Sequence, residues 1–507
     1  MTYAPPDGEP LSSEATPPLS MRSRVARATV WVVWARGVLQ GISFVSTLVL
    51  ARLLSPEDFG VFALVTVWTG VIAVIAELGL GDTIVQFRKL RDAELNACFW
   101  LMTGLSILGY LVLYVSAPAI ATLFANDALS DFLRVLALTV PLVGVRIVPE
   151  SLLRKQVRLD RISQVEIAAV LPSIPVVIGL AAAGAGVWAL AAQVLTQALI
   201  RTLGMYTFAR WRPGLILAGG KLRPLLRFGT ARLGTAACYI AYQQADVLVL
   251  GKVCGSFALG LYAVALQISQ LPVEKISAVV NQLAVPVMAE LQADRAAVRS
   301  VVLRGLRLVA SVTLPLCVAV MLLADDLVLV ALTDKWSGAI PVLRLLSLYA
   351  LVRSLAVLFP PALLASYRAG FLFAYNLVLL LVMPLAFWIG AVHWQAMGVA
   401  AAWLVVYPLV MVWMVREALR EIGLSWTALA RHLWPPVMAT LSMVAVVAPA
   451  LWATTSWTGS LVPVRLVLTS VAGMAVYAVI LFRFQRPATQ EIRDVVGWFL
   501  QGHRVGA

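Results

Sequence analysis

Long apolar stretches constrain this chain more than any other feature of its sequence. They recur along almost its whole length, each about twenty residues long, separated by charged residues or by proline and glycine. A helix needs about twenty residues to cross a hydrocarbon core of about 30 Å. With 61% apolar and only 13% charged residues, against about a quarter charged in soluble domains, the chain must be an integral membrane protein. No segment has the short alternating pattern of a membrane barrel, so we expect an all-α fold.

The apolar stretches predict fourteen transmembrane helices. If the N-terminus is cytoplasmic, the inner segments hold 28 Lys and Arg residues, and the outer segments hold three, Arg52, Lys252 and Lys335. A missed helix would reverse every later loop and destroy this asymmetry, so both termini are predicted to be cytoplasmic. The predicted spans are 28–51, 58–79, 95–117, 131–150, 164–183, 186–208, 231–251, 257–288, 303–324, 338–363, 369–391, 396–416, 434–453 and 461–482.

Breaks and composition divide the chain into two lobes of six helices with two further helices at the C-terminus. The proline-rich N-terminus and the basic segments between the lobes are predicted to lie outside the membrane core. The predicted parts are a disordered cytosolic tail (1–24), an N-lobe (25–212), an amphipathic inter-lobe linker (213–230), a C-lobe (231–418), an interfacial linker (419–433), two last helices (434–483) and a cytosolic tail (484–507).

Two segments 200 residues apart resemble each other. VLARLLSPEDFGVFALV (49–65) and VLGKVCGSFALGLYAVA (249–265) share four identities, including Gly60/Gly260, and align Arg52 with Lys252. Six predicted helices separate them, so both copies have the same orientation in the membrane. This favours parallel repeats related by an axis along the membrane normal, with a central site between them. The alternative is that both are merely short outer turns in which glycine loosens the second helix.

The first copy, together with ELGLGDTIVQ (77–86) and DVLVLGKVCGSFALGLYAVA (246–265), resembles the polysaccharide transport family of the MOP superfamily, the Wzx-type flippases. The second copy departs from that pattern at Cys254 and Phe257. The resemblance implies a MATE-like, V-shaped, pseudo-twofold transporter in the bacterial inner membrane. Its cargo would be an undecaprenyl-pyrophosphate-linked oligosaccharide for exopolysaccharide, capsule or O-antigen, translocated by alternating access. A lipid II flippase and a MATE-type drug or cation antiporter are the alternatives.

Polar side chains inside apolar helices mark the candidate substrate cavity, since a charge at mid-membrane costs about 2.5–3.5 kcal/mol. Fixed cations and hydrogen-bonding groups suit a pyrophosphate-linked glycan. For Arg36 the alternative is snorkelling to the head groups, for Arg232 a cytoplasmic anchor, and for Arg146 an ion pair with Glu150. The cavity candidates are Arg36, Gln40, Ser43, Arg146, Arg232, Tyr239, Tyr242, Gln243, Glu274, Lys275, Asn281 and Arg353.

Asp246 and Glu274 are the candidates for coupling transport to H⁺ or Na⁺, although Asp246 could instead pair with Lys252 or Arg52. Gate or hinge candidates are Pro272, Pro286, Gly60 and Gly260, and for the prolines the alternative is a static kink.

No motif of a hydrolase, glycosyltransferase or nucleotide-binding enzyme is found in the sequence. We therefore expect no enzyme activity, no metal or other cofactor and no nucleic-acid partner. The expected partners are the lipid-linked oligosaccharide, membrane lipids, and the polysaccharide polymerase with its chain-length machinery.

Overall fold

The computed structural model describes residues 41–43, 45–87, 90–214, 225–226, 234, 237–291, 294–454 and 461–484, and within these ranges its regular structure is entirely helical. Ten helices of this part of the chain are long and apolar enough to cross a membrane. The predicted all-α membrane fold is thereby confirmed, while the count of fourteen spans stays a prediction.

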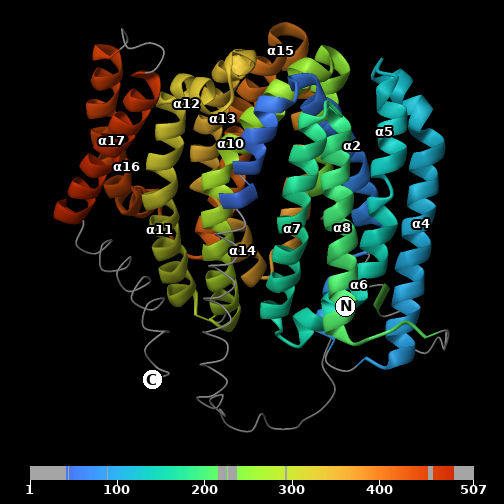
Figure 1. The fold of residues 1–507 in the computed structure, drawn as a ribbon. Coiled ribbons are helices and arrows are strands. Elements are labelled where there is room, and N and C mark those ends of the chain that lie inside the picture. The colour runs from blue at the N-terminus through green and yellow to red at the C-terminus, as the bar shows by residue number, and fades with distance from the viewer. Residues whose placement is uncertain are drawn as a thin grey trace, which may run out of the picture.

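The first bundle of helices follows residues 56–209 (Figure 1). The predicted span 131–150 is divided into α5 and α6, which begins at Thr139 and has Pro141 in its first turn, where a missing N–H is tolerated. The elements are α2 (Pro56–Glu77), α3 (Leu80–Gln86), α4 (Asp92–Leu123), α5 (Ala128–Leu136), α6 (Thr139–Lys155), α7 (Leu159–Ala182) and α8 (Val187–Ala209).

The second bundle follows residues 245–421, and two of its helices contain internal breaks. α10 departs from helical φ/ψ at Gly255, and α15 does so at Trp394 and Gln395. Each break falls between two predicted spans, so α15 covers two of them, and α10 covers the span 257–288 and the end of the span 231–251. The elements are α10 (Ala245–Glu290), α11 (Arg295–Leu322), α12 (Ala324–Ala331), η1 (Asp334–Ala339), α13 (Ile340–Ser354), α14 (Phe359–Ala365) and α15 (Ala369–Glu421).

The last two helices, α16 (Trp426–Ala453) and α17 (Val462–Phe484), lie at one edge of the molecule, beside α11 and α12 (Figure 1). Arg465 of α17 donates to both carboxylate oxygens of Asp326, which is 2% exposed, and to the carbonyl oxygen of Thr454. The hydroxyl of Tyr477 donates to the carbonyl of Ser311 at 2.6 Å. This pair of helices is therefore tied to the second bundle by buried polar contacts as well as by apolar packing.

The SPED sequence of the first repeat copy sets the start of α2. Ser55 is the N-cap: its hydroxyl accepts from the backbone N–H of Asp58 at 3.2 Å, and the Asp58 carboxylate accepts from the backbone N–H of Ser55 at 2.9 Å. This is a capping box, with Pro56 at the first helical position, where proline is favoured. The start of α2 is thus fixed by local sequence.

The two repeat copies pack against each other, and their shared glycines make this possible. A Cβ on Gly60 would lie 1.8 Å from the carbonyl oxygen of Ser256, and one on Gly260 would lie 1.7 Å from that of Pro56. Only glycine allows backbones to approach so closely. The sequence resemblance therefore marks the place where the first bundle meets the second.

Cations surround this contact in a reciprocal arrangement. Arg52, just before α2, donates to the carbonyls of Val330 and Ala331 at the end of α12. Its counterpart Lys252 in α10 donates to the carbonyl of Leu123 at the end of α4. Each cation thus caps the C-terminal end of a helix in the opposite bundle, where the helix dipole favours positive charge.

Two further donors come from η1 of the second bundle. The Lys335 ammonium donates to the carbonyls of Arg52 and Leu54, at 2.8 and 2.6 Å. The buried Trp336 indole donates to the carbonyl of Ala51 at 2.8 Å. We call Arg52, Gly60, Lys252, Gly260, Lys335 and Trp336 together the bundle crossing.

Candidate functional site

A cavity of about 360 Å³ lies within the second bundle, between α10, α13 and α15. Its polar lining comes mainly from one face of α10, on which Gln267, Gln270 and Glu274 follow each other at spacings of three and four residues. Polar groups inside apolar helices need a polar environment, so this cavity is the candidate functional site. It is lined by Gln243, Asp246, Val247, Ala263, Leu266, Gln267, Gln270, Leu271, Glu274, Lys275, Tyr349, Arg353 and Trp403.

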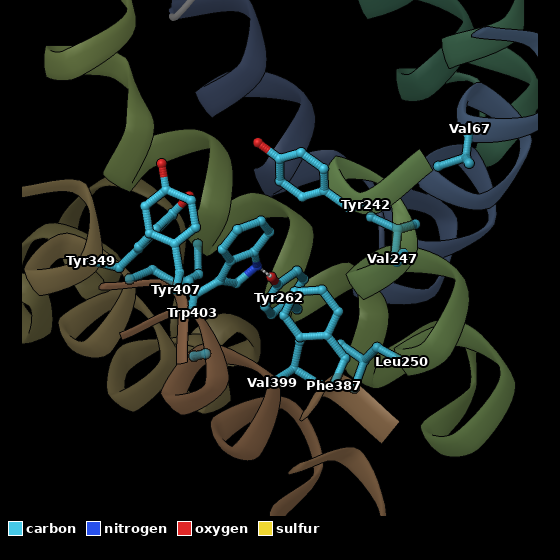
Figure 2. Packing of buried hydrophobic residues seen from close by; sticks show 14 of the residues in the cluster. Val67, Tyr242, Val247, Leu250, Tyr262, Tyr349, Phe387, Val399, Trp403 and Tyr407 are labelled. Carbon is cyan, nitrogen blue, oxygen red and sulfur yellow. Dashed lines mark hydrogen bonds between the residues drawn. The ribbon is translucent and has the colours of Figure 1, made fainter. Parts of the chain in front are cut away.

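One wall of the cavity is a buried carboxylate held by aromatic donors. Asp246, which is fully buried, accepts from the Tyr262 hydroxyl at 2.6 Å, from the Trp403 indole N–H at 3.0 Å and from the backbone N–H of Val247 at 2.7 Å. Tyr262 lies beyond the break at Gly255, so this contact joins the two parts of α10. Figure 2 shows the Trp403 indole directed at the Tyr262 hydroxyl.

An aromatic cluster continues this wall. Trp403 stacks on Tyr349 with ring centroids 4.8 Å apart, and Tyr407 packs edge-on against Tyr349 at 5.4 Å (Figure 2). Phe387 lies 5.0 Å from the Trp403 ring. Rings that interlock in this way hold α13 and α15 at a fixed distance behind the cavity.

Arg353 is the half-buried cation of the site, and Lys275, which also lines the cavity, is exposed. The Arg353 guanidinium donates to the Gln270 side-chain oxygen at 3.0 Å, and within the described ranges it forms no ion pair. The titratable groups that interact with it most strongly through space are Tyr349, Tyr239, Tyr407 and Tyr242, and their hydroxyls are neutral at physiological pH. Its positive charge is therefore not neutralised by an adjacent carboxylate.

The structure brings together several of the residues predicted from the sequence. Gln243, Asp246, Glu274, Lys275 and Arg353 line one cavity. The rings of Tyr239 and Tyr242 pack edge to face at 5.5 Å close to it. Ser43 and Asn281 are half-buried and do not line the cavity, and Arg36, Gln40 and Arg232 lie outside the described residues.

One predicted alternative for Asp246 is wrong. Lys252 and Arg52 do not pair with it, because both reach backbone carbonyls of the opposite bundle. Asp246 takes uncharged donors from Tyr262 and Trp403 instead. Its other predicted role, ion coupling, stays a prediction.

The ion pair predicted for Arg146 is confirmed. Its guanidinium lies 3.1 Å from the Glu150 carboxylate, which also pairs with Arg154. Arg146 does not line the cavity. Pro272 and Pro286 have helical backbone angles, and the residue of α10 whose backbone angles are not helical is Gly255. A gating role of these prolines stays a prediction.

Sequence reasoning missed the aromatic residues of the site. Tyr349, Trp403 and Tyr262 carry no charge and sit in apolar stretches, so they read as ordinary core or membrane-facing residues. A signal in the sequence could have found one of them: Tyr349 precedes Arg353 by four residues, which places both on one helix face.

The fold and the site define a class of protein. Two helical membrane bundles that meet at repeated segments, one of which contains a polar cavity, have the architecture of a membrane transporter. Residues 49–341, more than half of the chain, match the family model described as polysaccharide biosynthesis protein, and the chain belongs to this family.

Individual relatives agree with this assignment. The chain is 25% identical over 394 residues to the lipopolysaccharide biosynthesis protein WzxC of Escherichia coli (strain K12). This alignment covers 76% of this chain and 79% of that protein. It is 24% identical over 493 residues to the succinoglycan biosynthesis transport protein ExoT of Rhizobium meliloti (strain 1021), covering 95% and 97%.

A solved structure shares the fold. Lipid II flippase MurJ in an inward closed conformation superposes with a TM-score of 0.70 at 12% identity, covering 89% of this chain and 99% of that one. The fold predicted from the family resemblance is therefore confirmed.

Proposed function

We propose that this protein is a flippase that moves an undecaprenyl-pyrophosphate-linked oligosaccharide across the bacterial inner membrane for the synthesis of a surface polysaccharide. The observation that carries the proposal is the polar cavity among membrane-spanning helices, with its unneutralised Arg353. A cavity of this kind serves a polar, anionic cargo that cannot cross the lipid core unaided. Family membership and the printed functions of the two curated relatives support the same cargo class.

The bundle crossing supports transport by alternating access. In the predicted orientation it lies at the periplasmic end, where Gly60 and Gly260 bring the bundles into backbone contact. We take this as the closed outer gate of an inward-facing state. Release of cargo to the periplasm would then require the contacts of Arg52, Lys252 and Lys335 to break.

The protein would act without chemical catalysis, with both termini in the cytoplasm and with membrane lipids around it. It would hand its cargo to a polysaccharide polymerase and its chain-length machinery. Asp246 and Glu274, which both line the cavity, are the proposed groups for coupling to H⁺ or Na⁺.

The test is deletion of the gene followed by mass spectrometry of undecaprenyl-linked intermediates and analysis of surface polysaccharides. We expect a complete lipid-linked repeat unit to accumulate and one surface polymer to disappear, and wild-type protein to reverse both changes. Arg36→Ala and Arg353→Ala should restore less of the polymer than Arg344→Ala, since Arg344 pairs with Asp325 and is 47% exposed.

Other outcomes would favour the alternatives. Accumulation of the peptidoglycan precursor instead would identify a lipid II flippase. An unchanged lipid pool and unchanged surface glycans, with increased sensitivity to cationic drugs, would identify an efflux antiporter and refute the proposal.

A further inference from the structure

Hydrogen-bond donors without acceptors gather around Arg353. A guanidinium only donates, so the Gln270 amide must turn its oxygen toward Arg353, as its 3.0 Å contact shows. This orientation leaves the Gln270 amide nitrogen directed elsewhere, buried and without a hydrogen-bond partner among the residues that the structure describes. In the same part of the chain, the buried Tyr349 hydroxyl has no partner either. Both side chains line the cavity, and they are 5% and 1% exposed.

The acidic residues of the cavity do not supply the missing acceptor. Asp246 already accepts from Tyr262, Trp403 and its own neighbour Val247. Glu274 lies exposed on the next turn of α10 after Gln270, and in the described part of the chain it pairs with no cation. A cation with no ion-pair partner in the described ranges and two buried donors with no acceptor there therefore share one cavity wall, an arrangement that favours the binding of an anion.

We propose that Arg353, Gln270 and Tyr349 form an oxyanion subsite that takes one phosphate or carboxylate group of the cargo. The planar guanidinium fork matches the geometry of both groups. The cavity, at about 360 Å³, is near the lower end of ligand pockets, which span about 300–1,000 Å³, so it holds one charged unit rather than a whole oligosaccharide. This inference rests on the proposed function for the identity of the cargo.

Two parts of a lipid-linked glycan could present this chemistry, the pyrophosphate linker and an acidic sugar. We would measure binding to the purified full-length protein in detergent with two matched pairs of probes. Undecaprenyl pyrophosphate and undecaprenol test the linker, and methyl glucuronide and methyl glucoside test the sugar. In each pair the second molecule lacks the negative charge.

We expect the anionic member of at least one pair to bind, and Arg353→Gln to weaken that binding about tenfold to a hundredfold, as loss of a charged hydrogen bond does. The pair that responds identifies the source of the oxyanion. Arg344→Gln is the matched control on the same helix, because its cation already has Asp325 as a partner, and it should bind as wild type does.

Tyr349→Phe separates ligand binding from a structural role. It removes only a buried hydroxyl that has no partner, so the unfolding temperature should stay the same or rise. Binding of the responding anion should still weaken about threefold to tenfold, in keeping with the loss of one neutral hydrogen bond. Arg353→Lys should retain more affinity than Arg353→Gln, because it keeps the charge.

A cooperative unfolding transition first has to show that Arg353→Gln is folded. The subsite is refuted if this variant then binds both anionic probes as wild type does. It is also refuted if the neutral and anionic probes bind equally to the wild-type protein. Its failure is distinct from failure of the proposed function. Full restoration of the surface polymer by Arg353→Gln in a deletion strain that accumulates lipid-linked repeat units would refute the subsite and leave the flippase standing. Anion binding that depends on Arg353, in a protein whose deletion leaves the undecaprenyl-linked intermediates unchanged, would support the subsite and refute the flippase.

Discussion

Substitution of a crossing glycine should open the outer gate. In Gly60→Ala the new Cβ would lie 1.8 Å from the Ser256 carbonyl oxygen, and in Gly260→Ala 1.7 Å from that of Pro56, whereas real Cβ contacts are essentially never below 3.0 Å. The opposing atoms are backbone and cannot rotate away. The two bundles must therefore separate by about 1 Å or more at the crossing, as in other overpacked contacts.

The expected energy follows from the same geometry. Overpacking of this kind costs about 1–3 kcal/mol, and it acts only on the state in which the bundles touch. Since about 1.4 kcal/mol is a factor of ten in an equilibrium constant, the population of the open state relative to the closed state should rise about fivefold to 150-fold. Gly70→Ala is the control, because Gly70 lies on the same helix with nothing within 4 Å of its Cβ position. The change from glycine to alanine raises helix propensity by about 1 kcal/mol in Gly70→Ala as it does in Gly60→Ala, so this effect cancels in the comparison.

Cysteine labelling measures this change. Gln267, exposed and part of the cavity lining, is replaced by cysteine, and an impermeant maleimide is added outside intact cells. We expect labelling to be slow in the parent and in Gly70→Ala, and at least about fivefold faster in Gly60→Ala and Gly260→Ala. Equal labelling in all four proteins would refute the argument that the glycine contact closes the gate. The parent lacks the native cysteines Cys98, Cys238, Cys254 and Cys317.

Three further predictions concern other contacts. Glu57→Cys with Ser256→Cys replaces two side chains whose ends, the Glu57 carboxylate and the Ser256 hydroxyl, lie 3.3 Å apart. A short bis-methanethiosulfonate reagent, which spans the length lost from the glutamate, should cross-link the two cysteines and stop export until a reductant is added; transport that continues while cross-linked would contradict a moving gate. Asp326→Asn should lower the unfolding free energy by about 3–5 kcal/mol, because it removes the buried carboxylate that pairs with Arg465, whose side chain is only 14% exposed. Asp325→Asn, next to it but 47% exposed, should change it by less than about 1 kcal/mol, and equal shifts in thermal unfolding would show that burial does not decide the effect. Asp246→Asn should lower the unfolding free energy by about 1–3 kcal/mol, since the new amide nitrogen faces one of the three donors that the carboxylate now accepts from, Tyr262, Trp403 and the Val247 backbone. If this carboxylate couples transport, export by the variant should also lose its response to an imposed ion gradient.

Much of the fold follows from local sequence. Apolar stretches of membrane length must form helices, because no water is present to satisfy the backbone. The described helices follow the predicted spans, although 131–150 is divided between α5 and α6 and 338–363 between α13 and α14. The SPED capping box fixes the start of α2 in the same local way. The repeat of 49–65 at 249–265 also indicates that these two segments occupy equivalent places in the two bundles.

The partners of polar groups were beyond the reach of the sequence. Lys252 is six residues from Asp246 in the sequence. The Asp246 carboxylate nevertheless accepts hydrogen bonds from Tyr262 and from Trp403, which is 157 residues further along the chain. Lys252 and Arg52 turn to carbonyls of the opposite bundle, since the crossing places unsatisfied helix ends beside them.

The sequence alone determined that this chain is a helical membrane protein with two related halves, because hydrophobic length, charge asymmetry and repetition are properties of the chain itself. Tertiary structure alone decided that Gly60 and Gly260 meet, and that Arg353 shares a cavity with Gln270 and Tyr349 while forming no ion pair in the part of the chain that the structure describes. The physical reason is that these contacts depend on how α2, α10 and α13 pack against one another. Side-chain periodicity gives the face of each helix and leaves open which helix it will meet.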